Sequence, residues 1–233
     1  NKNFLLLGGK PLAYHIFNAL LGVKSVDQVC AYSSTDEFMA QIPGGVSYVA
    51  RDPSLDEDHV RGLDLLRTFA EQEPSDFYIL AHATSPFLTT TSLQAGVDGI
   101  LSGGYDSALS VSKVQKYFWY DQQPVNYDVN DIIQTQYIQP ALVETSGFYM
   151  FSKDDISKRS RRIGDHPKFV PVSLIEGIDI DDLEEFLFAR RFQDRLGESS
   201  TRLAWPTNGN STIGFALFDL EGTLTDSDGS VLA

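Results

Sequence analysis

Cysteine, long hydrophobic runs and positive charge are all scarce in this sequence. Cys30 is the one cysteine, which excludes an internal disulfide and fits a reducing compartment, so we expect a cytoplasmic protein. Cys30 lies in the apolar run 26–32, where a core residue is more common than a nucleophile. No stretch reaches the ~18 apolar residues of a membrane span. The apolar run at residues 4–7 is too short for a signal peptide.

Positive charge is outnumbered, with 18 Lys and Arg against 32 Asp and Glu and a formal net charge of −14. The basic footprint of a nucleic-acid-binding protein is absent, and so is a basic membrane-surface patch. An anionic substrate would therefore need local Lys and Arg side chains, or a metal ion, to offset the background field. The length of 233 residues, with 42% hydrophobic residues, suits one large α/β domain plus a fragment.

Short apolar runs alternate with amphipathic segments along most of the chain. We predict helices over residues 12–21, 59–72, 91–101 and 183–196, the first opened by Pro11. We predict strands over residues 26–32, 46–50, 77–81, 107–111, 148–151 and 170–172, with a helix cap at 33–36. This order predicts an α/β fold, a Rossmann-like three-layer sandwich with a mostly parallel sheet. Ligands of such sheets lie beyond the carboxyl ends of the strands.

Two regions break the alternation. Residues 113–139 are polar and rich in aromatic side chains, which suits either an interface or an ordered surface loop. Residues 197–211 are rich in Gly, Ser, Thr, Asn and Pro, which predicts a linker.

Asp179 and Asp181 flank one apolar residue, Ile180. If this segment is an extended strand, Ile180 can enter the core while both carboxylates face one site. Two adjacent carboxylates repel each other unless a cation lies between them, and oxygen ligands suit Mg²⁺. The alternative is a solvated acidic turn before the helix at 183–196.

Other candidate site residues follow predicted strands. Arg51 stands at the end of strand 46–50, where it can meet a ligand or form an ion pair with Asp52 or Asp56. His82, Thr84 and Ser85 follow strand 77–81, where they can read a base or ribose or form an ordinary turn. No Gly-x-Ser-x-Gly elbow is present, so Ser/His/Asp catalysis has no support.

Several motifs together resemble a known family. In chain order they are Lys2-Asn3, Gly8-Gly9-Lys10-Pro11-Leu12, Ser34-Thr35-Asp36, Arg51, Thr84-Ser85-Pro86, residues 104–111 (GYDSALSV), Phe148-Tyr149 and Asp179-Ile180-Asp181. The set resembles the N-acylneuraminate cytidylyltransferases over residues 1–196. In that family the anomeric hydroxyl of a sialic acid attacks the α-phosphate of CTP and pyrophosphate leaves.

The resemblance implies roles for individual residues. Asp179 and Asp181 would hold Mg²⁺, and Arg51 would act in catalysis and in nucleotide binding. The other implied nucleotide-binding residues are Lys2, Asn3, His82, Thr84 and Ser85. The implied sugar-binding residues are His82, Gln136 and Tyr149. The expected partners are CTP, an acidic nine-carbon sugar, and further copies of the chain in a homodimer or homotetramer joined through the excursion at 113–139.

The sequence departs from the family pattern at several points. The Gly-rich, Arg-containing phosphate loop of the family precedes the Lys-Asn pair, and this sequence starts after it. The segment 130–136 lacks the family's arginines, one of which pairs with the sugar carboxylate. Either the acid sugar differs from the common one, or Lys113 or Lys116 holds it instead. His82 stands where the family has Gln, and Thr145-Ser146 replaces Asn-Gly. Two alternatives stay open: a Kdo-type sugar cytidylyltransferase, and a non-catalytic paralogue that binds nucleotide or assembles.

A second, shorter resemblance lies near the end of the chain. Residues 215–226 (FALFDLEGTLTD) are similar to the first motif of haloacid-dehalogenase-like phosphatases. Asp219 would be the nucleophile, and Glu221 stands where the family has a second aspartate. A stray β-hairpin is the alternative. We thus predict a cytidylyltransferase domain at 1–196, a linker at 197–211 and the start of a second domain at 212–233.

Overall fold

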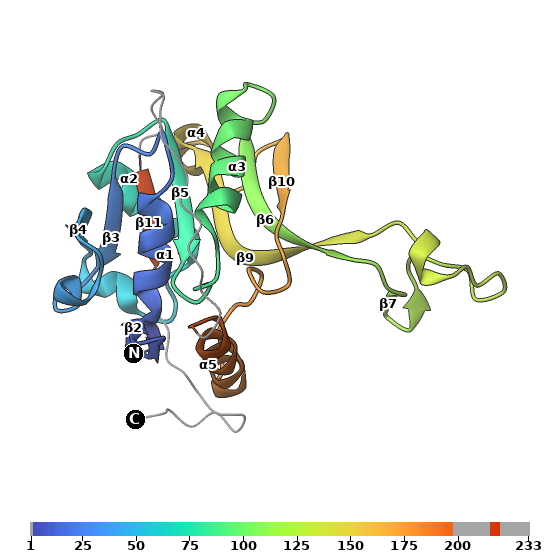
Figure 1. Cartoon of the computed structure of the whole chain (residues 1–233). Coiled ribbons are helices and arrows are strands. Elements are labelled where there is room, and N and C mark those ends of the chain that lie inside the picture. Colours follow the sequence, from blue (N-terminus) through green and yellow to red (C-terminus); the bar gives the residue numbers. More distant parts are fainter. Residues whose placement is uncertain (1, 198–214, 220–233) are drawn as a thin grey trace.

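The fold is built on a seven-stranded mixed sheet, seen in a computed structural model that describes residues 2–197 and 215–219 (Figure 1). The strand order is β10-β6-β9-β5-β11-β3-β4, and every neighbouring pair is parallel except the two that involve β9. The predicted mostly parallel sheet is therefore confirmed.

The elements follow the predicted alternation closely. The sheet strands are β3 (Val29–Ser33), β4 (Val46–Ala50), β5 (Phe77–His82), β6 (Ser107–Val114), β9 (Ala141–Ser152), β10 (Pro167–Pro171) and β11 (Phe215–Asp219). The α-helices are α1 (Leu12–Leu21), α2 (Gly62–Gln72), α3 (Thr90–Leu101), α4 (Lys153–Ser157) and α5 (Leu183–Gly197). Short hairpins are β1 (Leu6–Leu7) with β2 (Lys10–Pro11), and β7 (Trp119–Tyr120) with β8 (Gln123–Pro124).

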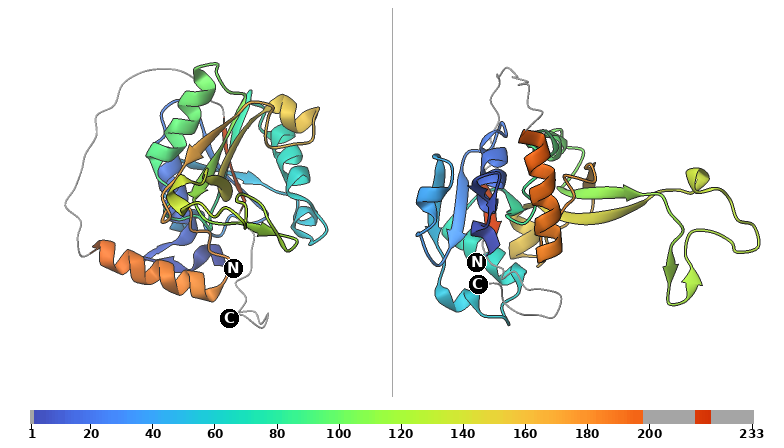
Figure 2. Two further views of the ribbon diagram at one scale, coloured as in Figure 1. Left: turned by 90° about the vertical axis from the view of Figure 1, so that its right-hand side faces the viewer. Right: turned by 60° about the horizontal axis from the view of Figure 1, so that its bottom comes forward.

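The sheet is the middle layer of three. One face packs against α1 and α3, in a core that includes Phe17, Val97 and Phe148. The other face packs against α2 and α4, through side chains such as Phe69 and Ile156. Side chains of a strand alternate between the faces, so adjacent residues of β5 and β9 supply both cores. Figure 2 shows these layers from two further directions.

Three local predictions are wrong. The expected helix after residues 33–36 does not form, because Ser33 Oγ accepts the N–H of Thr35 and Thr35 Oγ1 accepts that of Glu37. Only the 3₁₀ turn Met39–Gln41 follows. Helix α2 begins three residues later than expected, after a turn closed by Val60 N–H and Glu57 O. Strand β9 is far longer than the predicted apolar run 148–151 and antiparallel to both neighbours.

The predicted excursion is an arm that projects from the sandwich (Figure 1). Strands β6 and β9 extend into it as a paired ribbon, and β7, β8 and the 3₁₀ turn Thr135–Tyr137 form its outer part. Its exposed apolar and aromatic residues include Trp119, Tyr120, Ile132 and Tyr137. These side chains are available to another surface.

The segment 178–182 is held by a small third core. Ile180 is fully buried with Leu7, Leu12 and Phe186, so its predicted core position is confirmed. Its N–H donates to Thr84 O at 2.8 Å, which ties the segment to the loop after β5. The segment is an irregular stretch before α5 and not a strand of the sheet, which corrects that expectation.

Strand β11 confirms that residues 215–219 are extended. It lies inside the main sheet, where it pairs in parallel with β5 and β3. Glu221 and the predicted linker beyond Gly197 lie outside the described residues, and the division at 196 and 212 stays a prediction.

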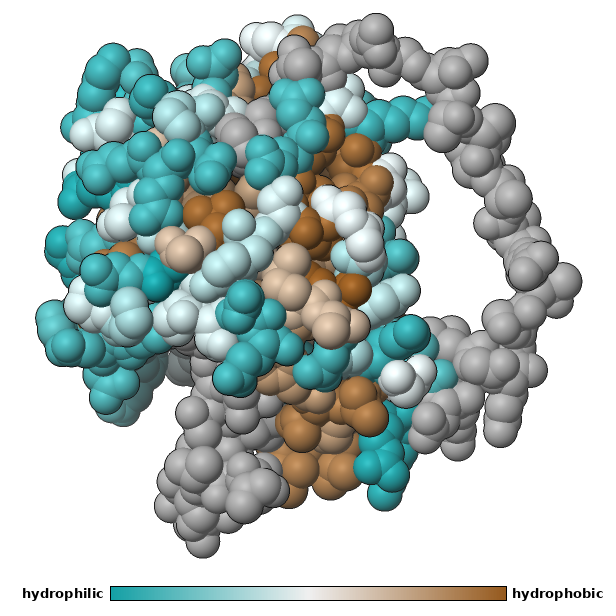
Figure 3. All heavy atoms as spheres, turned by 90° about the vertical axis from the view of Figure 1, so that its left-hand side faces the viewer, coloured by the Kyte–Doolittle hydropathy of each residue, from teal (hydrophilic) through white to brown (hydrophobic). Residues whose placement is uncertain are grey.

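The surface agrees with the polar composition. The side of the molecule on the left of Figure 1 is largely hydrophilic, with hydrophobic side chains gathered in its middle and lower parts (Figure 3). None of the helices in the described part of the chain is long and apolar enough to cross a membrane.

Candidate functional site

A cavity of about 420 Å³ opens beside the carboxyl ends of β3 and β5. Its volume is within the ordinary range for small-molecule sites. Aliphatic side chains of α2 and the end of β5, among them Leu66 and Leu80, form its apolar wall. The position is the one that the parallel-sheet rule predicts for a ligand.

The polar lining of this cavity is cationic. It consists of four arginines with Tyr32, His82 and Ser160, and no Asp or Glu of the described residues lines it. The four are Arg51, Arg61, Arg161 and Arg162. A cationic lining in a chain with a net charge of −14 indicates a site for an anionic ligand.

Arg51 and Tyr32 lie together in the deep part of the cavity. The Arg51 guanidinium is buried, donates to Asp56 Oδ1 at 2.9 Å and lies 5.7 Å from the centre of the Tyr32 ring. The ion pair with Asp56 that the sequence allows is therefore present. The Tyr32 hydroxyl is buried and has no hydrogen-bond partner among the described residues. Burial raises the pKa of Tyr32, although the charge of Arg51 opposes the shift, so the phenol stays neutral and can donate a hydrogen bond to a ligand.

His82 and Tyr149 are brought together by the pairing of β5 with β9. Their ring centres lie 6.4 Å apart, on the face of the sheet that carries α2. The Tyr149 hydroxyl donates to Glu144 Oε2 at 2.7 Å. Burial and this bond raise the pKa of Tyr149, against the opposing charge of Arg162. The Arg162 guanidinium lies 3.8 Å from the centre of the Tyr149 ring.

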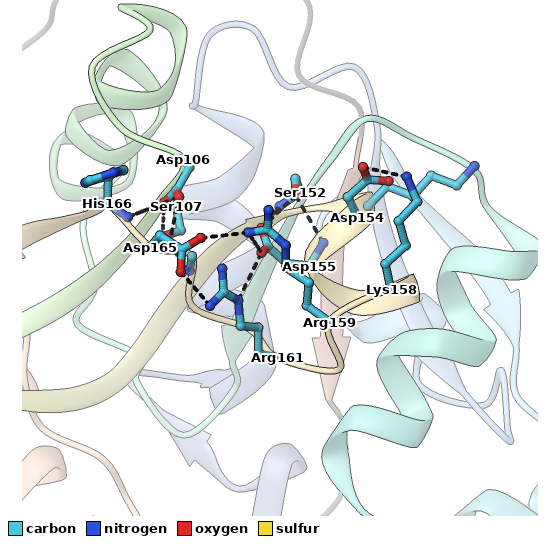
Figure 4. A network of polar contacts seen from close by, with 12 residues as sticks. Asp106, Ser107, Ser152, Asp154, Asp155, Lys158, Arg159, Arg161, Asp165 and His166 are labelled. Carbon is cyan, nitrogen blue, oxygen red and sulfur yellow. Dashed lines mark hydrogen bonds and ion pairs between the residues drawn. The ribbon is translucent and has the colours of Figure 1, made fainter.

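The loop that carries Arg161 and Arg162 is fixed by a network of ion pairs and hydrogen bonds (Figure 4). Arg161 pairs with Asp155 at 3.3 Å and with Asp165 at 2.8 Å, and Arg159 pairs with the same two carboxylates. Asp106 accepts the backbone N–H groups of residues 165 and 166 at 2.7 and 3.0 Å. The loop therefore presents its side chains to the cavity in a set position.

Asp179 and Asp181 line a separate hollow of about 500 Å³ together with Glu184 and Glu185. Asp181 is exposed and accepts from Lys2 Nζ at 2.9 Å. Asp179 Oδ1 is buried without a hydrogen-bond partner in the part of the chain that the structure describes. Neither carboxylate lines the cationic cavity.

The two carboxylates fit a divalent cation in their chemistry. A buried carboxylate oxygen that nothing neutralises is costly, and a metal ion would satisfy Asp179 Oδ1. In this structure the cation beside Asp181 is the Lys2 ammonium. Among the described residues no group of three or more His, Cys, Asp or Glu side chains is arranged to hold a metal ion. Mg²⁺ commonly takes one or two carboxylates and completes its shell with water and substrate phosphates, so Mg²⁺ at Asp179 and Asp181 stays a prediction.

The remaining predicted residues lie at varied distances from the cavity. Lys2, Asn3, Thr84 and Ser85 are buried, and the Ser85 hydroxyl has no hydrogen-bond partner among the residues described. None of the four lines the cationic cavity. The loop after β5 connects the two hollows, since His82 lines one and Thr84 O binds Ile180 N–H beside the other.

Gln136 and the C-terminal motif lie elsewhere. Gln136 is exposed on the arm and lines neither hollow. The exposed Lys113 and Lys116 lie on the arm as well and are also absent from the lining. Asp219 ends β11 in register with Tyr32 and His82, so its backbone lies at the same sheet edge as the cavity.

Sequence reasoning missed Tyr32, Arg61, Arg161 and Arg162. Residues 158–162 (KRSRR) form a concentrated basic run in an acidic chain, and that run was the available signal for the last two. Tyr32 offered no such signal, because a tyrosine in an apolar strand most often belongs to the core.

Comparisons with known proteins point to one family. The family model described as cytidylyltransferase matches residues 1–159. N-acylneuraminate cytidylyltransferases of Streptococcus agalactiae serotypes III and Ia are each 28% identical over 121 residues, which is 50% of this chain. The chain spans 29% of the length of these curated relatives.

Solved structures with the same fold include two synthases of cytidylyl products. The 4-diphosphocytidyl-2C-methyl-D-erythritol synthase from Anaerococcus prevotii has a TM-score of 0.57 at 13% identity, covering 84% of this chain and 91% of that one. A CMP:2-keto-3-deoxy-manno-octonic acid synthetase complexed with CTP has a TM-score of 0.52 at 16% identity, covering 92% and 83%. At these identities the likeness establishes the α/β fold.

Proposed function

The chain belongs to the cytidylyltransferase family, and from that premise we propose that the protein transfers CMP from CTP to an N-acylneuraminate or related acidic sugar, releasing pyrophosphate. The observation that carries the proposal is the cationic cavity at the carboxyl ends of β3 and β5, lined by residues of the matched region and by residues 160–162 that directly follow it. The S. agalactiae relatives support an acidic nine-carbon sugar as the acceptor.

In the proposed reaction the anomeric hydroxyl of the sugar attacks the α-phosphorus of CTP. The new bond joins the sugar oxygen to phosphorus and the hydroxyl proton passes to water. The bond from the α-phosphorus to the bridging oxygen breaks, and pyrophosphate leaves with that electron pair. Transfers of this type depend on positioning and on charge neutralisation more than on covalent help from side chains.

The side chains of the two hollows suit those two tasks. Arg51 and the neutral Tyr32 phenol offer donors in the deep part of the cavity for the nucleotide. The sugar would lie beside His82, which lines the cavity and has its ring centre 6.4 Å from that of Tyr149. Asp179 and Asp181 would hold Mg²⁺, with Lys2 released from Asp181 to face the phosphates. When bound, Mg²⁺ supplies positive charge against the triphosphate and lowers the pKa of the attacking hydroxyl.

We also propose that the active form is a homodimer or a homotetramer. The arm exposes large aromatic and aliphatic side chains far from the sandwich core, with Tyr120 at 81% exposure. Exposed apolar groups gathered on one projecting element are typical of interaction surfaces. Gln136 lies on this arm, and it would meet a sugar only across such an interface.

The test is an assay of pyrophosphate release by the full-length protein with CTP, Mg²⁺ and a panel of acidic sugars. Release with an N-acylneuraminate supports the proposal. Release with Kdo alone would contradict the proposal and favour a Kdo-type cytidylyltransferase. No release with any acid would favour a non-catalytic paralogue. The Lys2 ammonium beside Asp181 supports that alternative, because it occupies the position that a metal ion would take.

A further inference from the structure

Arg162 differs from the other arginines of the cationic cavity. Arg51, Arg61 and Arg161 each pair with a carboxylate at 2.8–3.1 Å. Within the described part of the chain, no carboxylate lies within ion-pair distance of Arg162. A partly buried guanidinium without a counter-ion favours an anion arriving from outside.

The orientation of Arg162 suits such an anion. Its guanidinium lies 3.8 Å from the centre of the Tyr149 ring. Contact with an aromatic ring does not use up the N–H donors of a guanidinium, and no hydrogen bond joins those of Arg162 to another described residue. Those N–H groups match the two oxygens of a carboxylate.

The backbone around Arg162 is fixed before any ligand binds. Arg161, its neighbour, is paired with Asp155 and Asp165, and Gly164 N–H donates to Ser107 Oγ at 2.8 Å. A Cβ atom at Gly164 would overlap the Asp106 carboxylate, so this close approach requires glycine. A preformed loop reduces the conformational entropy lost on binding.

We propose that Arg162 recognises the carboxylate of the acidic acceptor sugar. This inference rests on the proposed function and deepens it by naming a specificity-determining residue for the acceptor. Arg162 would take the role for which residues 130–136 provide no arginine. It lies beside Tyr149, whereas Lys113 and Lys116 are exposed on the arm. The expected acceptor therefore carries a carboxylate next to its anomeric carbon, and a neutral hexose is rejected.

The test measures binding by isothermal titration calorimetry, using the full-length protein with saturating CMP. The probes are N-acetylneuraminate and its methyl ester, which lacks the negative charge. In Arg162→Gln the affinity for the acid is expected to fall about tenfold to a hundredfold, as for loss of a charge-assisted pair. The affinity for the ester, and for CTP titrated in the absence of CMP, should stay within about twofold of wild type.

Two further variants sharpen the test. Arg162→Lys keeps the charge and loses the planar fork, so an intermediate loss is expected. Lys158→Gln removes one positive charge from the same segment, where Lys158 is exposed and pairs with Asp154 outside the cavity, and acid binding should not change. Melting temperatures of all variants exclude misfolding as the cause.

Several results would overturn the inference. They are unchanged acid affinity in Arg162→Gln, an equal loss for acid and ester, an equal loss in Lys158→Gln, or no binding of the acid to wild type. Pyrophosphate release is measured separately. If the protein binds the acid through Arg162 but shows no turnover, the inference holds and the proposed function is wrong. If turnover occurs and does not depend on Arg162, the proposed function holds and the inference is wrong.

Discussion

Replacing Ile180 by alanine tests whether the small core around this residue positions the acidic pair Asp179 and Asp181. Ile180 is fully buried against Leu7, Leu12 and Phe186. Truncation of a buried Ile to Ala is expected to cost about 2–4 kcal/mol and to lower the melting temperature by roughly 4–15 °C for a domain of this size. The hydrogen bond from Ile180 N–H to Thr84 O would weaken, because the side chain that fixes this backbone segment in the core would be shorter.

The functional consequence should fall on Mg²⁺. Asp179 and Asp181 are positioned by the residue between them, so a loosened Ile180 is expected to raise the Mg²⁺ concentration for half-maximal pyrophosphate release at least about fivefold. The matched control is Ile16→Ala, an identical truncation at a fully buried position of α1 in the main core. It should cost similar stability and leave the Mg²⁺ dependence unchanged.

Equal shifts of the Mg²⁺ dependence in Ile180→Ala and Ile16→Ala would refute this reasoning, because the effect would then follow from general destabilisation. A normal Mg²⁺ dependence in a destabilised Ile180→Ala would separate the acidic pair from metal binding.

Three further predictions concern a carboxylate, acid stability and the arm. Asp181→Asn is expected to reduce turnover by at least about a hundredfold with an unchanged circular dichroism spectrum, and near-wild-type turnover would remove Asp181 from the metal site. Burial acts to raise the pKa of Asp106, but the N–H groups of residues 165 and 166 outweigh it and hold that pKa below its usual range. The stability that this carboxylate contributes is fully present above its pKa in the unfolded chain, near 4. It is lost as the pH falls through its lower pKa in the folded protein. Chemical denaturation at several pH values should show Asp106→Asn to be less stable at neutral pH and less sensitive to this acid range; an unchanged pH profile would contradict the assignment. In the arm, a Trp119→Asp, Tyr120→Asp double variant should have the molar mass of a monomer by light scattering, and a wild-type mass would place the interface elsewhere.

Strong local patterns predicted much of the fold. Helix α1 has the predicted bounds because Pro11 begins it and the apolar residues of its period all meet the core. Strand β4 also has the predicted bounds. Strand β9 was underestimated because its first half, 141–146, pairs with β6 in the arm, where only three apolar residues precede the polar residues 144–146 and the burial pattern of a core strand is missing. Its antiparallel direction is set by tertiary pairing, which a single apolar run does not encode.

The candidate site was predicted in part. Arg51 and His82 do line the cavity, because parallel strands end at the same sheet edge and the residues after them meet there. Asp179 and Asp181 lie in a separate hollow, since the segment between β10 and α5 is irregular and turns around the buried Ile180. Arg162 reaches the cavity from a loop fixed by contacts that span many residues, such as Asp106 with residue 165. Spacing along the chain does not reveal such contacts.

The most direct test of the account is mass spectrometry of the product formed by the full-length protein from CTP, Mg²⁺ and N-acetylneuraminate. The proposed function predicts one new species whose mass is that of CMP plus the sugar acid minus one water, formed together with an equal amount of pyrophosphate. Unchanged CTP and sugar, or CMP released by hydrolysis without any joined product, would contradict it.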